Sequence, residues 1–113
     1  MNLANALNAQ VITASGSSAA VEIPPMEQVG AAQVAVNIDV TAASGTSPSI
    51  TFSLEWSDDG STWATPSPAQ SFAALTAVSQ VIEEFAVLGA FVRLAWTVSG
   101  TTPSFTVTAE MEA

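Results

Sequence analysis

Few side chains of this sequence could carry out chemistry, and most of those are carboxylates. Asp58 stands next to Asp59, Glu83 stands next to Glu84, and Arg93 is the only cation of the chain. Two carboxylates that converge on a glycosidic bond can hydrolyse it as acid and base. Neighbouring residues of a strand point to opposite faces, so neither pair is expected to converge. We interpret the first pair as turn residues and the second as part of a solvated face.

Other catalytic routes lack the residue types that they need. The chain has no His, Cys, Lys or Tyr, so a nucleophilic triad has no base and a thiolate metal site has no ligand. Residues 57–61 bring two carboxylates and two hydroxyls into one turn, as calcium sites do. An Asp-Gly turn between two strands explains the same residues. The sequence therefore predicts no enzyme, no cofactor and no metal site, and it leaves calcium binding at this turn open.

The charge of the chain excludes several kinds of partner. Ten acidic residues against one basic residue give 113 residues a formal charge of −9. Phosphate backbones and anionic membranes repel such a chain, so we expect no nucleic-acid and no membrane partner. The first five residues contain neither a basic start nor a sustained apolar run, so no secretory signal is predicted.

The three tryptophans and the single arginine are the remaining candidates for a binding site. Trp56 and Trp96 continue the apolar faces of their strands, so we expect both in the core, whereas Trp63 is the one expected to be exposed. A platform of tryptophans with nearby carboxylates would suit a carbohydrate, which is one alternative function. Arg93 is expected to pair with Asp39 or Glu55 across the sheet, or to anchor a subunit interface.

A repeated phrase predicts the elements that position these residues. Residues 44–55 begin Ser-Gly-Thr-Ser-Pro-Ser, and residues 99–110 begin Ser-Gly-Thr-Thr-Pro-Ser and continue in the same pattern. Each copy follows a stretch of alternating apolar residues, and the first loop is one residue longer than the second. We interpret each unit as a β-hairpin, with a pseudo-twofold relating the two.

The rest of the chain also indicates strands. Residues 19–23 form a short strand stopped by two prolines, and Asp59 with Gly60 predicts a hairpin that sets Trp56 opposite Trp63. Residues 75–88 fit either a helical stripe or a strand, and we favour a strand over 78–85 followed by a tight turn at 88–89. The predicted fold is all-β: a single-domain antiparallel β-sandwich of about seven to nine strands, Ig-like or jelly-roll-like, over residues 19–113.

Residues 1–18 differ from the rest and are predicted to form an N-terminal arm. Leu3, Leu7 and Val11 have helical i, i+4 spacing within an Asn- and Ala-rich stretch that ends in a Ser/Gly run. One interpretation is a partly ordered tail with a linker, and the other is an arm that docks on a neighbouring subunit. Leu3, Leu7 and Val11, together with Arg93 and Trp63, are therefore the candidate interface residues.

The repeated phrase, the turn at residues 55–63 and the stretch 91–97 leading into residues 100–105 carry a family resemblance. Together they resemble small virion proteins encoded among the structural genes of tailed bacteriophages, several of which are capsid decoration, or cement, proteins. The resemblance covers residues 34–110 and includes no catalytic residues.

The resemblance implies a structural protein that binds the major capsid protein and stabilises the outer shell. It further implies a homo-oligomer, with a trimer favoured, located on the capsid surface of the virion after synthesis in the host cytoplasm. A tail-tube or fibre accessory β-domain is the first alternative. A carbohydrate- or host-surface-binding module is the second.

Overall fold

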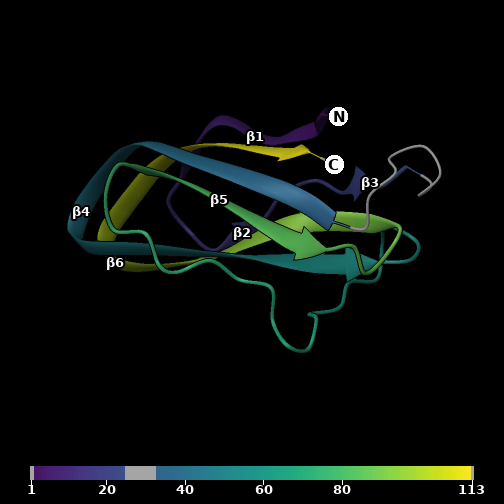
Figure 1. The fold of residues 1–113 in the computed structure, drawn as a ribbon. Helices are drawn as coiled ribbons and strands as arrows, with labels where there is room; N and C mark the ends of the chain where they lie inside the picture. The colour runs from purple at the N-terminus through teal and green to yellow at the C-terminus, as the bar shows by residue number, and fades with distance from the viewer. Residues whose placement is uncertain (1, 25–32, 113) are drawn as a thin grey trace.

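The computed structural model describes residues 2–24 and 33–112, and its regular structure in these ranges is entirely β (Figure 1). The strands are β1 (Asn2–Ile12), β2 (Gly16–Ser17), β3 (Val21–Glu22), β4 (Gln33–Ser57), β5 (Ser79–Ala86) and β6 (Phe91–Glu112). The predicted all-β, single-domain fold is confirmed. Counting the two halves of β4 and of β6 separately gives eight strand segments, within the predicted range.

The two longest strands build both layers of the sandwich. The sheet order is β1-β6-β4-β5, all pairs are antiparallel, and β2 and β3 also pair with β6. The first half of β4 pairs with the last half of β6, and the second half of β4 pairs with the first half of β6. Both strands bend together midway, so one continuous ladder folds over into two layers (Figure 1).

The two copies of the repeated phrase pair with each other rather than each with itself. Ser44 lies opposite Ser104, Thr46 opposite Thr101, and Ser49 opposite Ser99. Exchanging the two copies maps these pairs onto one another, which is the relation of a local pseudo-twofold. The predicted pairing within each hairpin is therefore wrong, because the Gly/Pro/Ser/Thr segments are corners of long strands and not hairpin turns.

Glycine makes the shared corner possible. Gly45 and Gly100 have φ angles of 115° and 111°, which side chains rarely adopt. A Cβ on Gly45 would lie 2.7 Å from the carbonyl oxygen of Thr102, and one on Gly100 would lie 2.7 Å from that of Ser47. Each glycine thus lets the backbone of the other copy approach it closely.

The extra residue in the first copy is a β-bulge. Val40 pairs with Val107 and Ala42 pairs with Thr106, so Thr41 has no partner of its own in the register. A bulge adds one residue to one strand and increases its local bend. The one-residue difference between the copies is therefore absorbed within the ladder, just before the corner.

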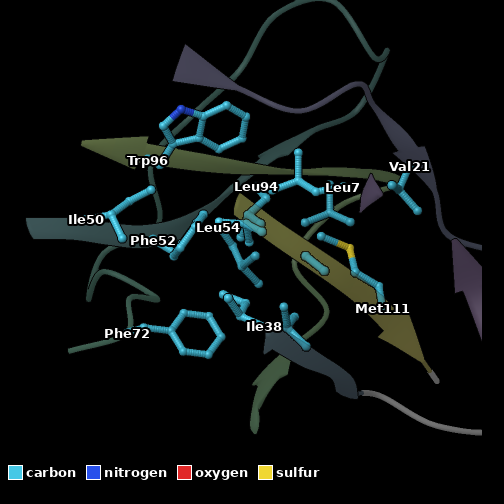
Figure 2. Close-up of a cluster of buried hydrophobic side chains, with 14 of the residues drawn as sticks. Leu7, Val21, Ile38, Ile50, Phe52, Leu54, Phe72, Leu94, Trp96 and Met111 are labelled. Atoms are coloured by element: carbon cyan, nitrogen blue, oxygen red, sulfur yellow. The ribbon is translucent and has the colours of Figure 1, made fainter. Parts of the chain in front are cut away.

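The core lies between the two layers and contains Trp56 and Trp96, the second of which is labelled in Figure 2. The side chain of Trp56 is 5% exposed and that of Trp96 is 6% exposed, which confirms their prediction as core residues. Trp96 packs edge-on against Phe52, with ring centroids 6.2 Å apart. Each indole N–H is satisfied: Trp56 donates to Oε1 of Gln70 at 2.6 Å, and Trp96 donates to the carbonyl oxygen of Ala14 at 3.1 Å.

The ambiguous segment at 75–88 contains β5, as predicted for residues 78–85. Val81 and Phe85 pack against the core, and the ring of Phe85 meets that of Phe72 at a centroid distance of 5.4 Å. Val78 and Ile82, members of the alternative helical stripe, are exposed. Period-two alternation therefore describes this segment correctly, because only one face of β5 meets the core.

The predicted N-terminal arm is part of the sandwich. β1 and β2 both pair with β6, and Ser18 exchanges two hydrogen bonds with Leu94, so the boundary predicted after residue 18 does not separate two structural units. Leu7 and Ile12 are 2% and 3% exposed. Their spacing of five would place them on opposite faces of a regular strand. A register shift between Leu7 and Gln10 turns both toward the core.

Replacing Leu7 by Ala should therefore lower the free energy of unfolding by about 2–5 kcal/mol, as for other buried leucines. Val11→Ala in the same strand is the control, because the side chain of Val11 is 61% exposed. It should cost less than about 1 kcal/mol. Urea denaturation of both variants measures the difference. Equal, small effects would show that β1 does not dock on its own sheet.

Candidate binding site around Trp63 and Arg93

The sheet register places the only cation of the chain directly opposite a carboxylate. Glu55 of β4 and Arg93 of β6 are cross-strand partners, and Nε of Arg93 lies 2.7 Å from Oε1 of Glu55. Of the two partners predicted for Arg93, Glu55 is the one it contacts. Both residues alternate with buried neighbours, so the pair lies on the outer face of the sandwich. A partly exposed pair of this kind contributes about 0–1 kcal/mol.

Trp63 covers this ion pair. Cζ of Arg93 lies 4.5 Å from the centroid of the Trp63 ring, the arrangement of a cation–π contact. The ring is half-buried rather than fully exposed. Glu55, Arg93 and Trp63 thus form one stack, which we call the Arg93 stack.

The predicted pairing of Trp63 with Trp56 is wrong by one residue. Trp56 exchanges two backbone hydrogen bonds with Ala64, at 3.0 and 2.9 Å. The connection is longer than a two-residue hairpin, so Trp63 turns away from Trp56 and toward Arg93. The Asp-Gly signal located the turn correctly but did not determine its length.

Ser57 and Asp59 hold this connection in a fixed shape. The hydroxyl of Ser57 accepts hydrogen bonds from the backbone N–H of Asp59 and of Gly60, at 3.2 and 2.9 Å, and donates to Oδ1 of Asp59 at 2.9 Å. Oδ1 of Asp59 also accepts from the backbone N–H of Ser61 and of Thr62, at 2.8 and 2.9 Å. Gly60 supplies a positive φ of 79°. The loop is therefore organised by its own side chains.

These hydrogen bonds favour the charged form of Asp59. The backbone N–H of Thr62 contributes most, followed by that of Ser61 and the hydroxyl of Ser57, and together they lower the pKa of Asp59 from 3.8 to about 2. Asp59 is consequently ionised at neutral pH, and Oδ1 is committed to the loop.

An open pocket of about 500 Å³ lies beside the Arg93 stack. Its lining comprises Trp56, Ser57, Asp58, Asp59, Thr62, Trp63, Ala64 and Leu88. Aromatic rings beside hydroxyl and carboxylate oxygens suit a neutral, hydroxyl-rich ligand better than an anion, which the carboxylates would repel.

One of the two neighbouring carboxylate pairs of the sequence, Asp58 with Asp59, lines the pocket. Asp59 uses its Oδ1 within the loop, and Glu83 and Glu84 belong to β5, outside the lining. In residues 2–24 and 33–112, no group of three or more His, Cys, Asp or Glu side chains could hold a metal ion. Over the same ranges, no helix is long and apolar enough to cross a membrane.

The other three candidate interface residues lie in β1. Leu3 is half-buried against the core, Leu7 is inside it, and Val11 is exposed. The structure thus brings Trp63 and Arg93 together and leaves Leu3, Leu7 and Val11 as a separate set. Of that set, Val11 alone is largely open to solvent.

The exposed apolar residues of and around β5 were not among the candidate residues predicted from the sequence. Val78, Ile82 and Leu88 each expose more than half of their surface. The signal was present in the alternation, because Val78 and Ile82 have the opposite parity to Val81 and Phe85. A second pocket, of about 450 Å³, lies nearby. It is lined by Glu22, Ile23, Pro24, Val87, Gly89, Ala90 and Phe91.

No protein-family model matches the chain, and no curated protein matches it. The function proposed below therefore follows from the sequence pattern and from the charges, pockets and edges of the fold.

The loop that carries Asp59 should weaken in acid. Because the folded protein favours ionised Asp59, the contribution of this group to stability is fully present above pH 3.8 and is lost as the pH falls toward about 2. Carboxyl NMR titration should show a midpoint near pH 2 for Asp59. The acid-dependent part of the stability should be smaller in Asp59→Asn than in Asp58→Asn, since none of the loop hydrogen bonds described above uses Asp58. A midpoint at or above 3.8 would contradict the loop geometry.

Proposed function

We propose that this chain is a non-enzymatic structural protein of a bacteriophage virion that binds the outer capsid surface and stabilises the shell. The resemblance of residues 34–110 to small virion proteins supplies the family context. The observation that carries the proposal is electrostatic. Arg93, the only cation of the chain, is already paired with Glu55 and covered by Trp63.

The remaining charge of the molecule is negative. With Arg93 paired to Glu55 and covered by Trp63, the other nine of the ten acidic residues have no basic side chain of the chain left to pair with. A partner surface with positive charge would therefore complement this molecule. A protein shell with basic surface patches is such a partner, whereas nucleic acid and anionic lipid are not.

The architecture also suits a stabilising role. The ladder between β4 and β6 runs through both layers, and the molecule measures 46 × 25 × 21 Å. One core joins the layers, and every buried side-chain nitrogen or oxygen in the described ranges has a hydrogen-bond partner. Such a module can transmit load between the shell proteins that it contacts. As in the family that it resembles, we propose that it acts as a homo-oligomer, with a trimer favoured, bound to the major capsid protein.

Two alternatives remain as outcomes of the same test. A tail-tube or fibre accessory domain would use the same sandwich at another place in the particle. A carbohydrate-binding module is favoured by one observation, the open pocket in which Trp63 stands beside Asp58 and Thr62. Aromatic faces with nearby hydrogen-bonding groups are a common arrangement for small polar ligands.

The proposal is tested by reconstitution. Mature shells of the virus that encodes the protein are first stripped of their own copies. Purified protein is then added, and its occupancy on the shells is measured across a salt series. We expect saturable binding that weakens only partly with salt, because backbone and apolar contacts act beside the charges. Restored shells should also withstand higher temperature than stripped shells.

Shells that still carry their own copies are the control and should take up no more protein. Failure to bind stripped shells, with the protein found only in the tail, would favour the accessory domain. Retention on a glycan array that is lost in Trp63→Ala would favour the carbohydrate-binding module.

A further inference from the structure

β5 forms a regular edge of the sheet. It stands at the end of the strand order and pairs only with β4, through eight consecutive residue pairs without a register shift. In an antiparallel strand with one neighbour, the N–H and C=O groups on the far side are unpaired. Within the described part of the chain, no backbone hydrogen bond from a turn or loop reaches residues 79–86, and the loop side chain that does is Gln70, whose Nε2 donates to the carbonyl oxygen of Ala86 at the end of the strand. This edge can accept a further strand.

The other edges of the sheet have features that hinder pairing with a further strand. β1 carries three register shifts, and Ala9 within it has a φ of 47°. On one edge of the other layer, β2 and β3 have two residues each. On the opposite edge of that layer, residues 64–75 cover β4 through three isolated bridges. Bulged, short or covered edges resist pairing with another chain. Among the described strands, β5 is the long edge that lacks these protections.

Apolar and acidic side chains follow one another along β5 in a fixed order, which an incoming strand would meet. Val81 and Phe85 face the core side, with Glu83 exposed between them. Ile82 and Glu84 lie on the outer face, where Ile82 is 63% exposed. Read along the edge, the order is apolar, apolar, acidic, acidic, apolar.

The two carboxylates select against a second copy of this chain. An antiparallel self-pairing would bring four carboxylates to one short ladder, and like charges across a ladder are destabilising. The chain has no free cation to offset them, because Arg93 is held in its stack. A segment with two adjacent cations between apolar residues would instead complement the whole edge.

We propose that β5 receives an extended segment of a partner protein as an added antiparallel strand, with two adjacent Lys or Arg residues opposite Glu83 and Glu84. Apolar residues of the segment lie opposite Val81, Ile82 and Phe85. The order is specific, because a slip of one residue would exchange the two faces of the incoming strand. The inference rests on the proposed function only in taking that partner to be a protein of the shell.

The test uses the full chain and a capped peptide, Thr-Val-Lys-Lys-Val-Val-Thr, which places its lysines opposite the two glutamates in antiparallel register. The first control peptide has the same composition in the order Lys-Val-Thr-Val-Thr-Val-Lys. A second control is the matched peptide with alternate backbone amides methylated on the side that meets β5. NMR chemical-shift changes locate the binding, and fluorescence anisotropy measures the affinity.

We expect the matched peptide to bind at least about tenfold more tightly than the permuted peptide, with shift changes centred on residues 79–86. Backbone methylation should abolish binding, since it removes ladder donors without changing charge. Equal affinity of the matched and permuted peptides would overturn the proposal, because only non-specific attraction would then remain.

Two protein variants with the same net charge distinguish binding at the β5 edge from attraction to the overall negative charge of the molecule. Glu83→Gln with Glu84→Gln should reduce the affinity for the matched peptide about tenfold, toward that of the permuted peptide. Glu110→Gln with Glu112→Gln removes two charges from β6, which β4 separates from β5 in the sheet, and should leave the preference intact. An equal loss in both variants would overturn the proposal, as would self-association of the unmodified chain that Ile82→Lys abolishes.

Binding of both variants to stripped shells distinguishes this inference from the proposed function. Weaker shell binding by the Glu83/Glu84 variant alone supports the edge as the docking surface. Equal shell binding by both variants overturns the edge and leaves the shell-binding function standing. Peptide selectivity without any shell binding supports the edge and removes the capsid as its partner.

Discussion

The structure depends on the close approach of two chain corners at Gly45 and Gly100. At each corner a backbone carbonyl of the opposite copy occupies the space that a Cβ would need. This contact lets two long strands bend together while their ladder continues from one layer to the other. The remaining strands add to this ladder from its sides, so the layering of the core follows from the corner.

The same ladder determines the electrostatics of the surface. Its register sets Arg93 opposite Glu55, and the longer connection after β4 brings Trp63 over the pair. The only cation of the chain is thereby neutralised within the molecule. The surface that remains carries an excess of carboxylates, two open pockets and the regular edge of β5. These features are the basis of the proposed binding role, in which a partner would contribute the positive charge.

The local features of the fold could be predicted from the sequence, whereas the long-range pairing could not. Alternation correctly identified the buried faces, the burial of Trp56 and Trp96, and a strand at residues 78–85. It could not tell a hairpin turn from a shared corner, because both require glycine at positive φ flanked by Ser, Thr and Pro. The choice between them depends on which distant strand completes the ladder.

Two further differences between the predicted and the observed structure have local causes that leave little trace in the sequence. β1 docks through bulges near Ala9, and alanine gives no signal for positive φ. For the candidate site, the sequence named Trp63 and Arg93 as interface candidates, a role that stays a prediction, and Glu55, one of the two partners predicted for Arg93, is the one that it contacts. The hydrogen bonds that Ser57 and Asp59 make within the loop, which lengthen the turn and move Trp63 onto Arg93, were not foreseen.

The pairing between the two copies of the repeat determines the layering of the fold, and backbone NMR contacts measure it directly. We expect cross-strand backbone NOEs between Ile38 and Ala109 and between Leu54 and Leu94, which belong to different copies. Backbone NOEs linking residues 36–40 to residues 50–54 of the same copy, as two separate hairpins would give, would contradict it.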